Sequence, residues 1–262
     1  MKHFILNRKG RKIAVVVNVS HHPNGLVFVM HGLSGFKEQE HIQLFAKSFR
    51  KNGFTIVLFD TTNTLGESEG KIEEATITNY FEDLEDVIAW AKKQKWYMEP
   101  FALAGHSLGG ICSILYAEKH PEKVQALAPI STVVSGKLSV EAHKEFEPED
   151  FENWQKTGWT ESKSRSKPGI MKRFPWSHIE DRLKYDTLPL AHRLTMPVLL
   201  ITGEKDTSTP PKHAQKLFDK LPGPKEFHVI KGSPHTFREK RHLEEVEKIF
   251  DNWIKKMEYR PK

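Results

Sequence analysis

The chain has 262 residues, of which 38% are hydrophobic and 28% charged, and its formal net charge is +6. This length suffices for a full hydrophobic core, and the composition is typical of folded globular proteins rather than disordered ones. The 40 basic residues are nearly matched by 34 acidic ones, which indicates a mixed surface. The sequence therefore predicts no nucleic-acid partner.

Cysteine content and apolar runs set the expected compartment. The single cysteine, Cys112, excludes an internal disulfide and a zinc cluster built on cysteines. The opening MKHFILNRKGRK has an apolar run shorter than the roughly 7–15 residues of a secretory signal. No run approaches the ~20 apolar residues of a membrane-spanning helix. We therefore expect a cytoplasmic protein without a membrane span.

Along the chain, strand-like and helix-like segments alternate. The first element is a hairpin, because two β-rich runs flank a Lys-Gly turn within residues 4–19. Short apolar runs predict further strands, and apolar residues at helical spacing predict helices between them. The strands are expected within 25–32, 54–60, 101–107, 124–131, 197–206 and 225–235, and the helices within 41–53, 79–94, 110–120, 211–221 and 242–257.

This order of elements predicts an α/β fold. Strands that are apolar throughout and separated by amphipathic helices are typical of a parallel sheet covered by helices on both faces. The hairpin adds an antiparallel start. Residues 1–132 and 191–262 would together form this core.

The alternation of predicted strands and helices is interrupted between residues 133 and 190. A segment this long without secondary structure is improbable in a compact domain, so we expect a helical insertion over the carboxyl-terminal edge of the sheet. It is rich in large aromatics, and acidic residues precede basic ones. One interpretation is a solvated helix and loop anchored by tryptophans. The other is a lid that lines a substrate pocket.

The sequence GHSLG, residues 105–109, has the G-x-S-x-G pattern and follows a strand and precedes a helix. In that context the pattern predicts a nucleophile elbow, a sharp turn that exposes the hydroxyl of Ser107. Side chains two positions before and after the serine would collide with the neighbouring strand and helix, which explains the glycines. A glycine-rich turn with an incidental serine is the alternative.

A serine nucleophile needs a base, and the chain has fourteen histidines. In folds with this elbow the base comes last in the chain, after the acid. His235 follows the last predicted strand and is the predicted base. His106, inside the elbow, is interpreted as a packing residue. His31, at the end of a strand, is expected to shape the loop that follows it.

The acid that orients the base is expected after the penultimate strand. The segment LLITGEKDTSTP offers two carboxylates there. We favour Asp206, which falls at the mouth of the loop, and keep Glu204 as the alternative. Asp60 is a weaker candidate, more typical of a hydrogen-bonded turn residue.

The oxyanion of an acyl transfer needs hydrogen-bond donors. In this kind of site they are two backbone N–H groups, one following the nucleophile and one in the loop after an early strand. These positions are Leu108 and Leu33. A tight turn with no such role is the alternative for HGLSG, residues 31–35.

Four segments in this order, HGLSGFKE, GHSLGG, GEKDTSTP and GSPHTF, resemble the α/β-hydrolase superfamily. The resemblance covers nearly the whole chain apart from 133–190 and is greatest to bacterial carboxylesterases, cinnamoyl and feruloyl esterases and monoacylglycerol-lipase-like enzymes. It implies the α/β-hydrolase fold, a mostly parallel eight-stranded sheet with a lid after the sixth strand. It also implies a Ser107–His235–Asp206 triad and ester hydrolysis without a metal or cofactor.

The sequence thus predicts a serine carboxylesterase acting on a small-molecule ester with a short-chain or aromatic acyl group. A monoacylglycerol lipase and an acyl thioesterase use the same machinery and remain alternatives. A non-catalytic binding module with this fold is a third alternative, although such a module is expected to have a degraded site. The sequence is compatible with a homodimer and does not define the oligomeric state.

Overall fold

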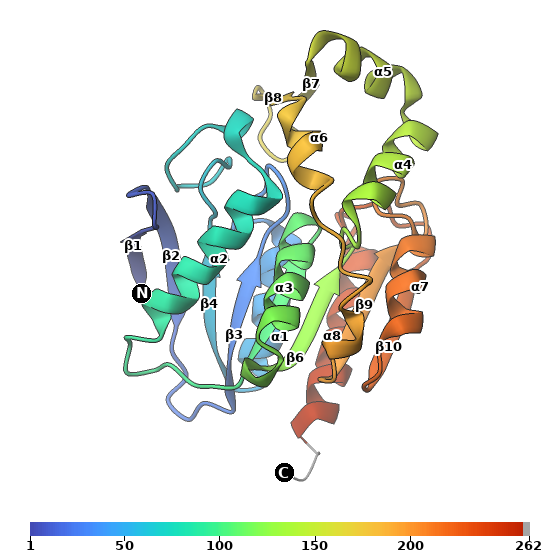
Figure 1. Ribbon diagram of the computed structural model, residues 1–262. Coiled ribbons are helices and arrows are strands. Elements are labelled where there is room, and N and C mark those ends of the chain that lie inside the picture. Colours follow the sequence, from blue (N-terminus) through green and yellow to red (C-terminus); the bar gives the residue numbers. More distant parts are fainter. Residues whose placement is uncertain (259–262) are drawn as a thin grey trace.

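The computed structural model describes residues 1–258, and its centre is an eight-stranded sheet with the strand order β1-β2-β4-β3-β5-β6-β9-β10 (Figure 1). The β1–β2 and β2–β4 pairs are antiparallel and the other pairs are parallel. The predicted sheet, including its antiparallel start, is therefore confirmed. Its strands are β1 (Lys2–Leu6), β2 (Lys12–Asn18), β3 (Gly25–Met30), β4 (Phe54–Phe59), β5 (Phe101–His106), β6 (Val124–Ile130), β9 (Val198–Gly203) and β10 (Lys225–Ile230).

Helices cover both faces of the sheet, each with its own apolar core. Strand β3 illustrates this arrangement, because Phe28 packs into one core and its neighbours Val27 and Val29 pack into the other. This alternation is what a strand buried on both faces requires. One face carries α1 (Glu40–Lys51) and α8 (Lys240–Glu258), and the other carries α2 (Ile77–Ala91), α3 (Leu108–Lys119) and α7 (Pro211–Lys220).

The segment 133–190, called the insertion from here on, lies between β6 and β9 and contains most of the structure beyond the carboxyl ends of the parallel strands (Figure 1). Three helices agree with the expected helical character. The insertion also contains an antiparallel hairpin that the sequence analysis did not predict. Its elements are α4 (Gly136–Phe146), α5 (Pro148–Thr157), β7 (Trp159–Lys163), β8 (Met171–Pro175) and α6 (Ser177–Arg182).

The aromatic residues of the insertion divide into two groups. Phe151, Trp154 and Phe174 are buried and belong to the same apolar core as α2 and α3. Phe146 and Trp159 are largely exposed, with 43% and 36% of their surface accessible. The buried group anchors the insertion to the sheet domain, as one of the two interpretations expected, and several aromatics also face the cavity described below.

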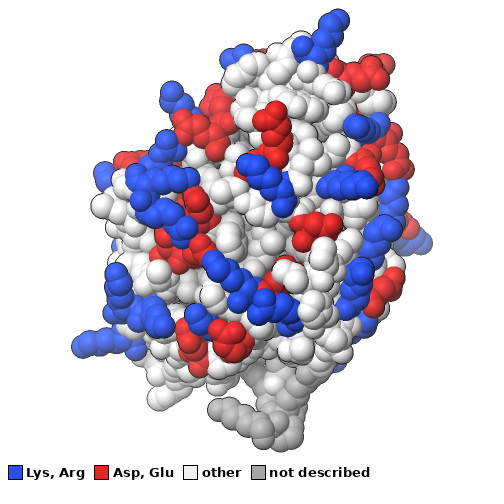
Figure 2. All heavy atoms as spheres, in the orientation of Figure 1, with Lys and Arg blue, Asp and Glu red and all other residues white. Residues whose placement is uncertain are grey.

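The outer surface is mixed in charge. On the face shown in Figure 2, Lys and Arg side chains alternate with Asp and Glu side chains and do not form a single basic stripe. Within residues 1–258 no helix is long and apolar enough to cross a membrane.

Candidate active site

Ser107 occupies a sharp turn between β5 and α3. Its backbone has φ of 54° and ψ of −112°, a conformation that non-glycine residues rarely adopt. A Cβ at Gly105 would lie 2.2 Å from the carbonyl oxygen of Gly109, and one at Gly109 would lie 2.5 Å from that of His31. The two glycines therefore allow a strand, a turn and a helix to approach closely enough to hold the serine in this strained position.

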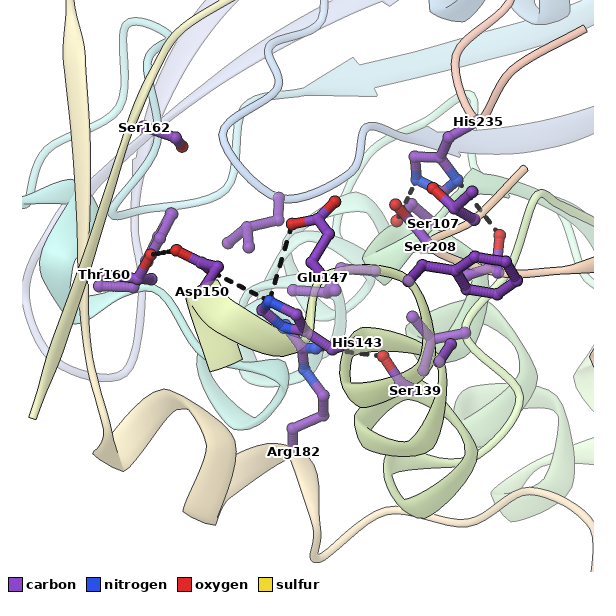
Figure 3. Close-up of a pocket in the computed structure, with 18 of the residues that line it drawn as sticks. Ser107, Ser139, His143, Glu147, Asp150, Thr160, Ser162, Arg182, Ser208 and His235 are labelled. Carbon is purple, nitrogen blue, oxygen red and sulfur yellow. Dashed lines mark hydrogen bonds and ion pairs between the residues drawn. The ribbon is translucent and has the colours of Figure 1, made fainter. Parts of the chain in front are cut away.

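Three side chains from separate loops, Ser107, His235 and Asp206, form a continuous chain of hydrogen bonds, of which Figure 3 shows the Ser107–His235 part. Ser107 Oγ lies 3.0 Å from His235 Nε2, and His235 Nδ1 lies 2.8 Å from Asp206 Oδ2. Asp206 follows β9 and His235 follows β10, so the parallel sheet brings the three residues to one edge. The bond from Nδ1–H to the carboxylate leaves Nε2 free to accept the serine proton.

The carboxylate of Asp206 is buried and held in a fixed orientation. It accepts hydrogen bonds from the backbone N–H groups of Ser208 and Thr209, at 2.9 and 2.8 Å, and from the Thr209 hydroxyl at 2.7 Å. Burial alone would raise the pKa of Asp206, but the charge and hydrogen bond of His235 and the Thr209 hydrogen bonds outweigh it and lower that pKa. The group is therefore an anion aimed at the imidazole.

The two alternative acids lie elsewhere. Glu204 is exposed, and its Oε2 accepts a hydrogen bond from the Gly232 N–H at 2.8 Å. Asp60 is fully buried, where it accepts from both the backbone N–H and the ammonium of Lys37 at 2.7 Å and from the Glu67 N–H at 2.8 Å. Neither carboxylate is hydrogen-bonded to a histidine in the described part of the chain.

The other two histidines near the site have structural contacts. His106 Nε2–H donates to the backbone carbonyl of His235 at 3.0 Å, and burial lowers the pKa of His106 to about 3, so its ring is neutral. His31 is buried and bridges its own loop, donating from Nδ1 to the Gly32 carbonyl and accepting at Nε2 from the Thr61 N–H. His106 therefore does more than pack, because it fixes the backbone that carries His235.

Leu33 and Leu108, the residues predicted to supply the oxyanion donors, border the same space. Leu108 begins α3, and the N–H groups of a first helical turn have no acceptor within the helix. Both leucines contribute to the wall of the cavity beside Ser107. Both positions predicted for the oxyanion donors therefore lie at the cavity that Ser107 also lines.

Ser107 and His235 open into a cavity of about 330 Å³ between the sheet and the insertion. Its sheet-side wall includes Leu33, Ser107, Leu108, Thr209 and His235. Its insertion-side wall includes Ser139, His143, Trp154, Lys172, Phe174 and Arg182. A reacting group bound at Ser107 would therefore be enclosed by both parts of the chain.

Of the polar residues of the insertion-side wall, Lys172 belongs to the basic run that the sequence analysis noted and that could favour an anionic substrate, whereas Arg182, His143 and Ser139 were missed. Arg182 ends α6, and Lys172 lies in the hairpin strand β8. His143 forms a pair with Asp150, with 2.9 Å between Nε2 and Oδ2. We recognised no sequence motif in the insertion. The only signal for the contact between His178 and Arg182 is their i, i+4 spacing, which places two side chains on the same face of a helix.

Two groups of three side chains in residues 1–258 have potential metal-ligand atoms within 4.8 Å of one another, namely His143, Glu147 and Asp150, and Glu38, Asp60 and Glu67. In the second group the ammonium of Lys37 bonds all three carboxylates, at 2.6–2.7 Å, and takes the place that a cation would fill. In the first group the His143–Asp150 hydrogen bond already uses one ligand atom of each residue.

The sheet, the strained serine turn and the enclosed Ser–His–Asp arrangement define an α/β hydrolase. Residues 21–169 match the family model described as "Serine aminopeptidase, S33", which spans more than half of the chain, and the chain belongs to that family. The expected superfamily is thereby confirmed.

The chain also resembles curated proteins, at sequence identities below 30%. The chain is 27% identical over 243 residues to "Palmitoyl-protein thioesterase ABHD10, mitochondrial" of Mus musculus, covering 89% of this chain and 76% of the relative. It is 25% identical over 266 residues to "Uncharacterized 31.7 kDa protein in traX-finO intergenic region" of Escherichia coli, covering 90% and 91%.

Solved structures share the fold. Est1E from Butyrivibrio proteoclasticus with bound ferulic acid superimposes with a TM-score of 0.78 at 20% identity, covering 97% of this chain and 98% of that one. Mouse alpha/beta hydrolase domain-containing protein 10 gives 0.78 at 23%, covering 98% and 99%.

Proposed function

We propose that this hydrolase is a serine carboxylesterase that acts on esters with short-chain or aromatic acyl groups. The observation that carries the proposal is the hydrogen-bonded chain from Asp206 through His235 to Ser107, which ends at the cavity between the sheet and the insertion. A serine hydroxyl bonded to an oriented imidazole is the arrangement that nucleophilic acyl transfer requires.

In the first half of the reaction Ser107 Oγ attacks the ester carbonyl carbon while its proton moves to His235 Nε2. The carbonyl oxygen becomes an oxyanion that accepts hydrogen bonds from the Leu33 and Leu108 N–H groups. The C–O bond to the alcohol then breaks, and His235 returns the proton to the departing alkoxide. Asp206 stabilises the imidazolium throughout.

In the second half a water molecule attacks the acyl group on Ser107. His235 Nε2 takes one proton from this water, a second tetrahedral oxyanion forms at the same two N–H groups, and the bond to Ser107 Oγ breaks. His235 gives its proton to the serine, and the carboxylic acid leaves. Each proton removed is returned, so the enzyme is regenerated without a cofactor.

The cavity volume supports a small acyl group. About 330 Å³ lies at the low end of the roughly 300–1,000 Å³ typical of ligand pockets, and the insertion, as a lid, would limit its length. The likeness to Est1E with ferulic acid is compatible with an aromatic group.

An acyl thioesterase is the second candidate, because the curated relatives include a palmitoyl-protein thioesterase. The same serine mechanism cleaves esters and thioesters. A monoacylglycerol lipase remains the alternative if long acyl chains are accepted.

The test is a fluorophosphonate probe followed by a substrate panel. We expect the probe to label Ser107, as mapped by mass spectrometry, and the panel to favour short 4-nitrophenyl and hydroxycinnamate esters over their S-thioesters and over an aminoacyl 4-nitroanilide. Absence of labelling in a folded protein would favour the binding-module reading. A thioester preference would replace the esterase assignment.

The proposal includes no metal, no cofactor and no nucleic-acid partner. Because His235 already supplies the base, we expect dialysis against EDTA to leave kcat/KM unchanged, and an atomic-absorption measurement to find no bound metal in the active protein. We place the enzyme in a reducing compartment such as the cytoplasm, where its free and buried Cys112 is stable.

A further inference from the structure

Arg182 puts a positive charge into the cavity wall without an anionic partner. Its Nη1 donates to the Ser139 hydroxyl at 3.1 Å, and its Nη2 donates to His178 Nε2 at 2.8 Å. Both acceptors are neutral. In residues 1–258 no carboxylate forms an ion pair with this guanidinium, a pattern that proteins normally avoid for a charge shielded from water.

The neutrality of His178 follows from its own contacts. Its Nδ1–H donates to the Ala75 carbonyl at 2.7 Å, which leaves Nε2 as an acceptor. Burial, together with the charge of Arg182, lowers the pKa of His178 to about 3, so the ring does not titrate near neutral pH. Burial also lowers the pKa of Arg182 to about 10, and the guanidinium therefore stays charged at pH 7.

Asp150 in the cavity wall and Asp181 next to Arg182 on α6 are already engaged. Asp150 accepts from His143 and from the Thr160 hydroxyl at 2.9 Å, and Asp181 accepts from the Thr78 backbone and hydroxyl. Glu147 also lines the cavity, but its side chain is 60% exposed and lies 3.7 Å from His143 rather than beside the guanidinium. None of them neutralises Arg182.

Other polar groups of the insertion-side wall point to the same kind of ligand. Two buried side-chain nitrogens of the cavity residues have no hydrogen-bond partner in the described structure, Arg182 Nε and Trp154 Nε1, and both are donors. The ammonium of Lys172, on the facing hairpin, likewise forms no ion pair within residues 1–258. The wall thus holds two cations and two donors without partners in the described structure, beside the carboxylates of Asp150 and Glu147, which contact His143.

Backbone contacts fix the end of α6 that carries Arg182, and its bonds to Ser139 and His178 orient the guanidinium. A Cβ at Gly136 would lie 1.8 Å from the Arg182 carbonyl oxygen, so α4 and the end of α6 touch at this glycine. The Gly136 N–H also donates to the Tyr185 carbonyl at 2.8 Å. Figure 3 shows Arg182 and Ser139 across the cavity from Ser107 and His235. A cation held this firmly is preorganised for an anion.

We propose that Arg182, with Lys172 and the Trp154 indole N–H, binds a carboxylate on the substrate, so that the preferred esters carry an anionic group away from the scissile bond. This rests on the proposed esterase function and adds a substrate class to it. A planar carboxylate suits a guanidinium, which donates in a fixed fork. The reaction at Ser107 is the same for anionic and neutral esters.

Matched pairs of esters test the proposal and show which part carries the charge. For the acyl part, 4-nitrophenyl hydrogen adipate is compared with 4-nitrophenyl hexanoate. For the alcohol part, 4-acetoxybenzoate is compared with its neutral methyl ester. We expect kcat/KM for the anionic ester to exceed that for the neutral one at least about tenfold in one pair, as a charge-assisted hydrogen bond in an enclosed site supplies.

Variants assign the preference to the cavity wall. Arg182→Gln should reduce the anionic-to-neutral ratio at least about tenfold, and Arg182→Lys should restore part of it. The control is Arg173→Gln, because Arg173 is another arginine of the insertion, next to Lys172 on β8, but is not a lining residue of the cavity and is paired with Glu161. It should leave the ratio unchanged.

The outcomes separate the two proposals. Hydrolysis of neither ester in either pair would refute the esterase function itself. Hydrolysis of the neutral esters with no anionic preference, or a preference that persists in Arg182→Gln, would overturn the carboxylate site alone.

Should Arg182→Gln fail to fold, the native protein provides the decisive measurement. Adipate should slow fluorophosphonate labelling of Ser107, whereas the neutral adipamide should not. Equal protection by both compounds, or by neither, would also overturn the site.

Discussion

The two walls of the cavity are built on different principles. On the sheet-side wall the imidazole of His235 is bonded to Ser107 and, behind the wall, to the buried carboxylate of Asp206, and Ser107 is fixed by its backbone. On the insertion-side wall Arg182 and Lys172 carry charge without an ion pair in the described structure. Because the hydrogen bonds of the sheet-side residues are made within the protein, these residues can act on any ester that reaches Ser107. The unpaired cations of the insertion-side wall need a partner, so they should favour some substrates over others.

The walls also differ in how they are supported. The strands that position Ser107 and Asp206, β5 and β9, are buried along their whole length. The hairpin that carries Lys172 is mostly exposed and is connected to the remainder through a few buried aromatics. Changes on the sheet side should therefore alter turnover of all substrates, and changes on the insertion side should alter their ranking.

The largest effect is expected at the nucleophile. Ser107→Ala removes the attacking oxygen and should reduce kcat by roughly 10⁴–10⁶ while the melting temperature stays close to that of the native protein. Ser208→Ala is the matched control, because Ser208 lines the same cavity but its hydroxyl is outside the proton path. A folded Ser107→Ala protein that keeps more than about a tenth of native kcat contradicts the assignment.

The second-largest loss of kcat is expected at Asp206, the acid of the triad. Asp206→Asn should reduce kcat on the order of 10²–10⁴, because the amide favours the wrong imidazole tautomer. Glu204→Gln should cost less than about tenfold, since Glu204 bonds only the backbone of Gly232 among the described residues. Steady-state kinetics of both variants on one activated ester make the comparison, and the reverse order of effects would move the acid to Glu204.

The sheet-side wall could be anticipated from sequence because its constraints are local. Gly105 and Gly109 are needed by a turn that no other residue tolerates, and the order of serine, acid and histidine follows from where parallel strands end. The helices had clear apolar faces. His106 was interpreted as packing, since its hydrogen bond to the His235 carbonyl joins residues 129 positions apart.

The insertion-side wall could not be anticipated from the sequence, because its geometry depends on contacts between segments that are distant in the chain. The hairpin strand β7, Trp159–Lys163, has no alternation of apolar and polar residues and is exposed on both faces, so no period marked it as a strand. Arg182 is the last residue of α6, a position where arginine is common, so nothing in the sequence assigned it to the cavity. Its half-buried position without an ion pair in the described structure depends on contacts with α4 and with Ala75 through His178, which only the folded chain brings together.

The preference for acyl length should depend on the insertion. With about 330 Å³ available, kcat/KM on 4-nitrophenyl esters should peak at about two to six carbons and fall at least about tenfold by about twelve. Replacing residues 137–186 with a short Gly/Ser linker should flatten this profile if the core stays folded, as circular dichroism would show. Equal or better activity of the intact protein on palmitate would favour a lipase and an open lid.

The smallest effect concerns stability in acid and compares one buried histidine on each side. Burial lowers the pKa of both His106 and His178 to about 3 from the usual 6.5. Above pH 6.5 both rings are neutral in the folded and unfolded chain, and they contribute no pH dependence. As pH falls from 6.5 toward 3 the unfolded chain takes up protons that the folded one excludes. Each ring should then lower the unfolding free energy by about 1.4 kcal/mol per pH unit.

Removing one of these rings should reduce that slope by about one proton, whatever the substitution costs in absolute stability. We therefore expect His178→Asn to unfold in urea with a shallower pH dependence between pH 6 and pH 5 than the native protein. An unchanged slope in His178→Asn would mean that His178 is protonated in the folded protein. Its Nε2 would then be unable to accept from Arg182, and the hydrogen-bonded support of the guanidinium would have to be different.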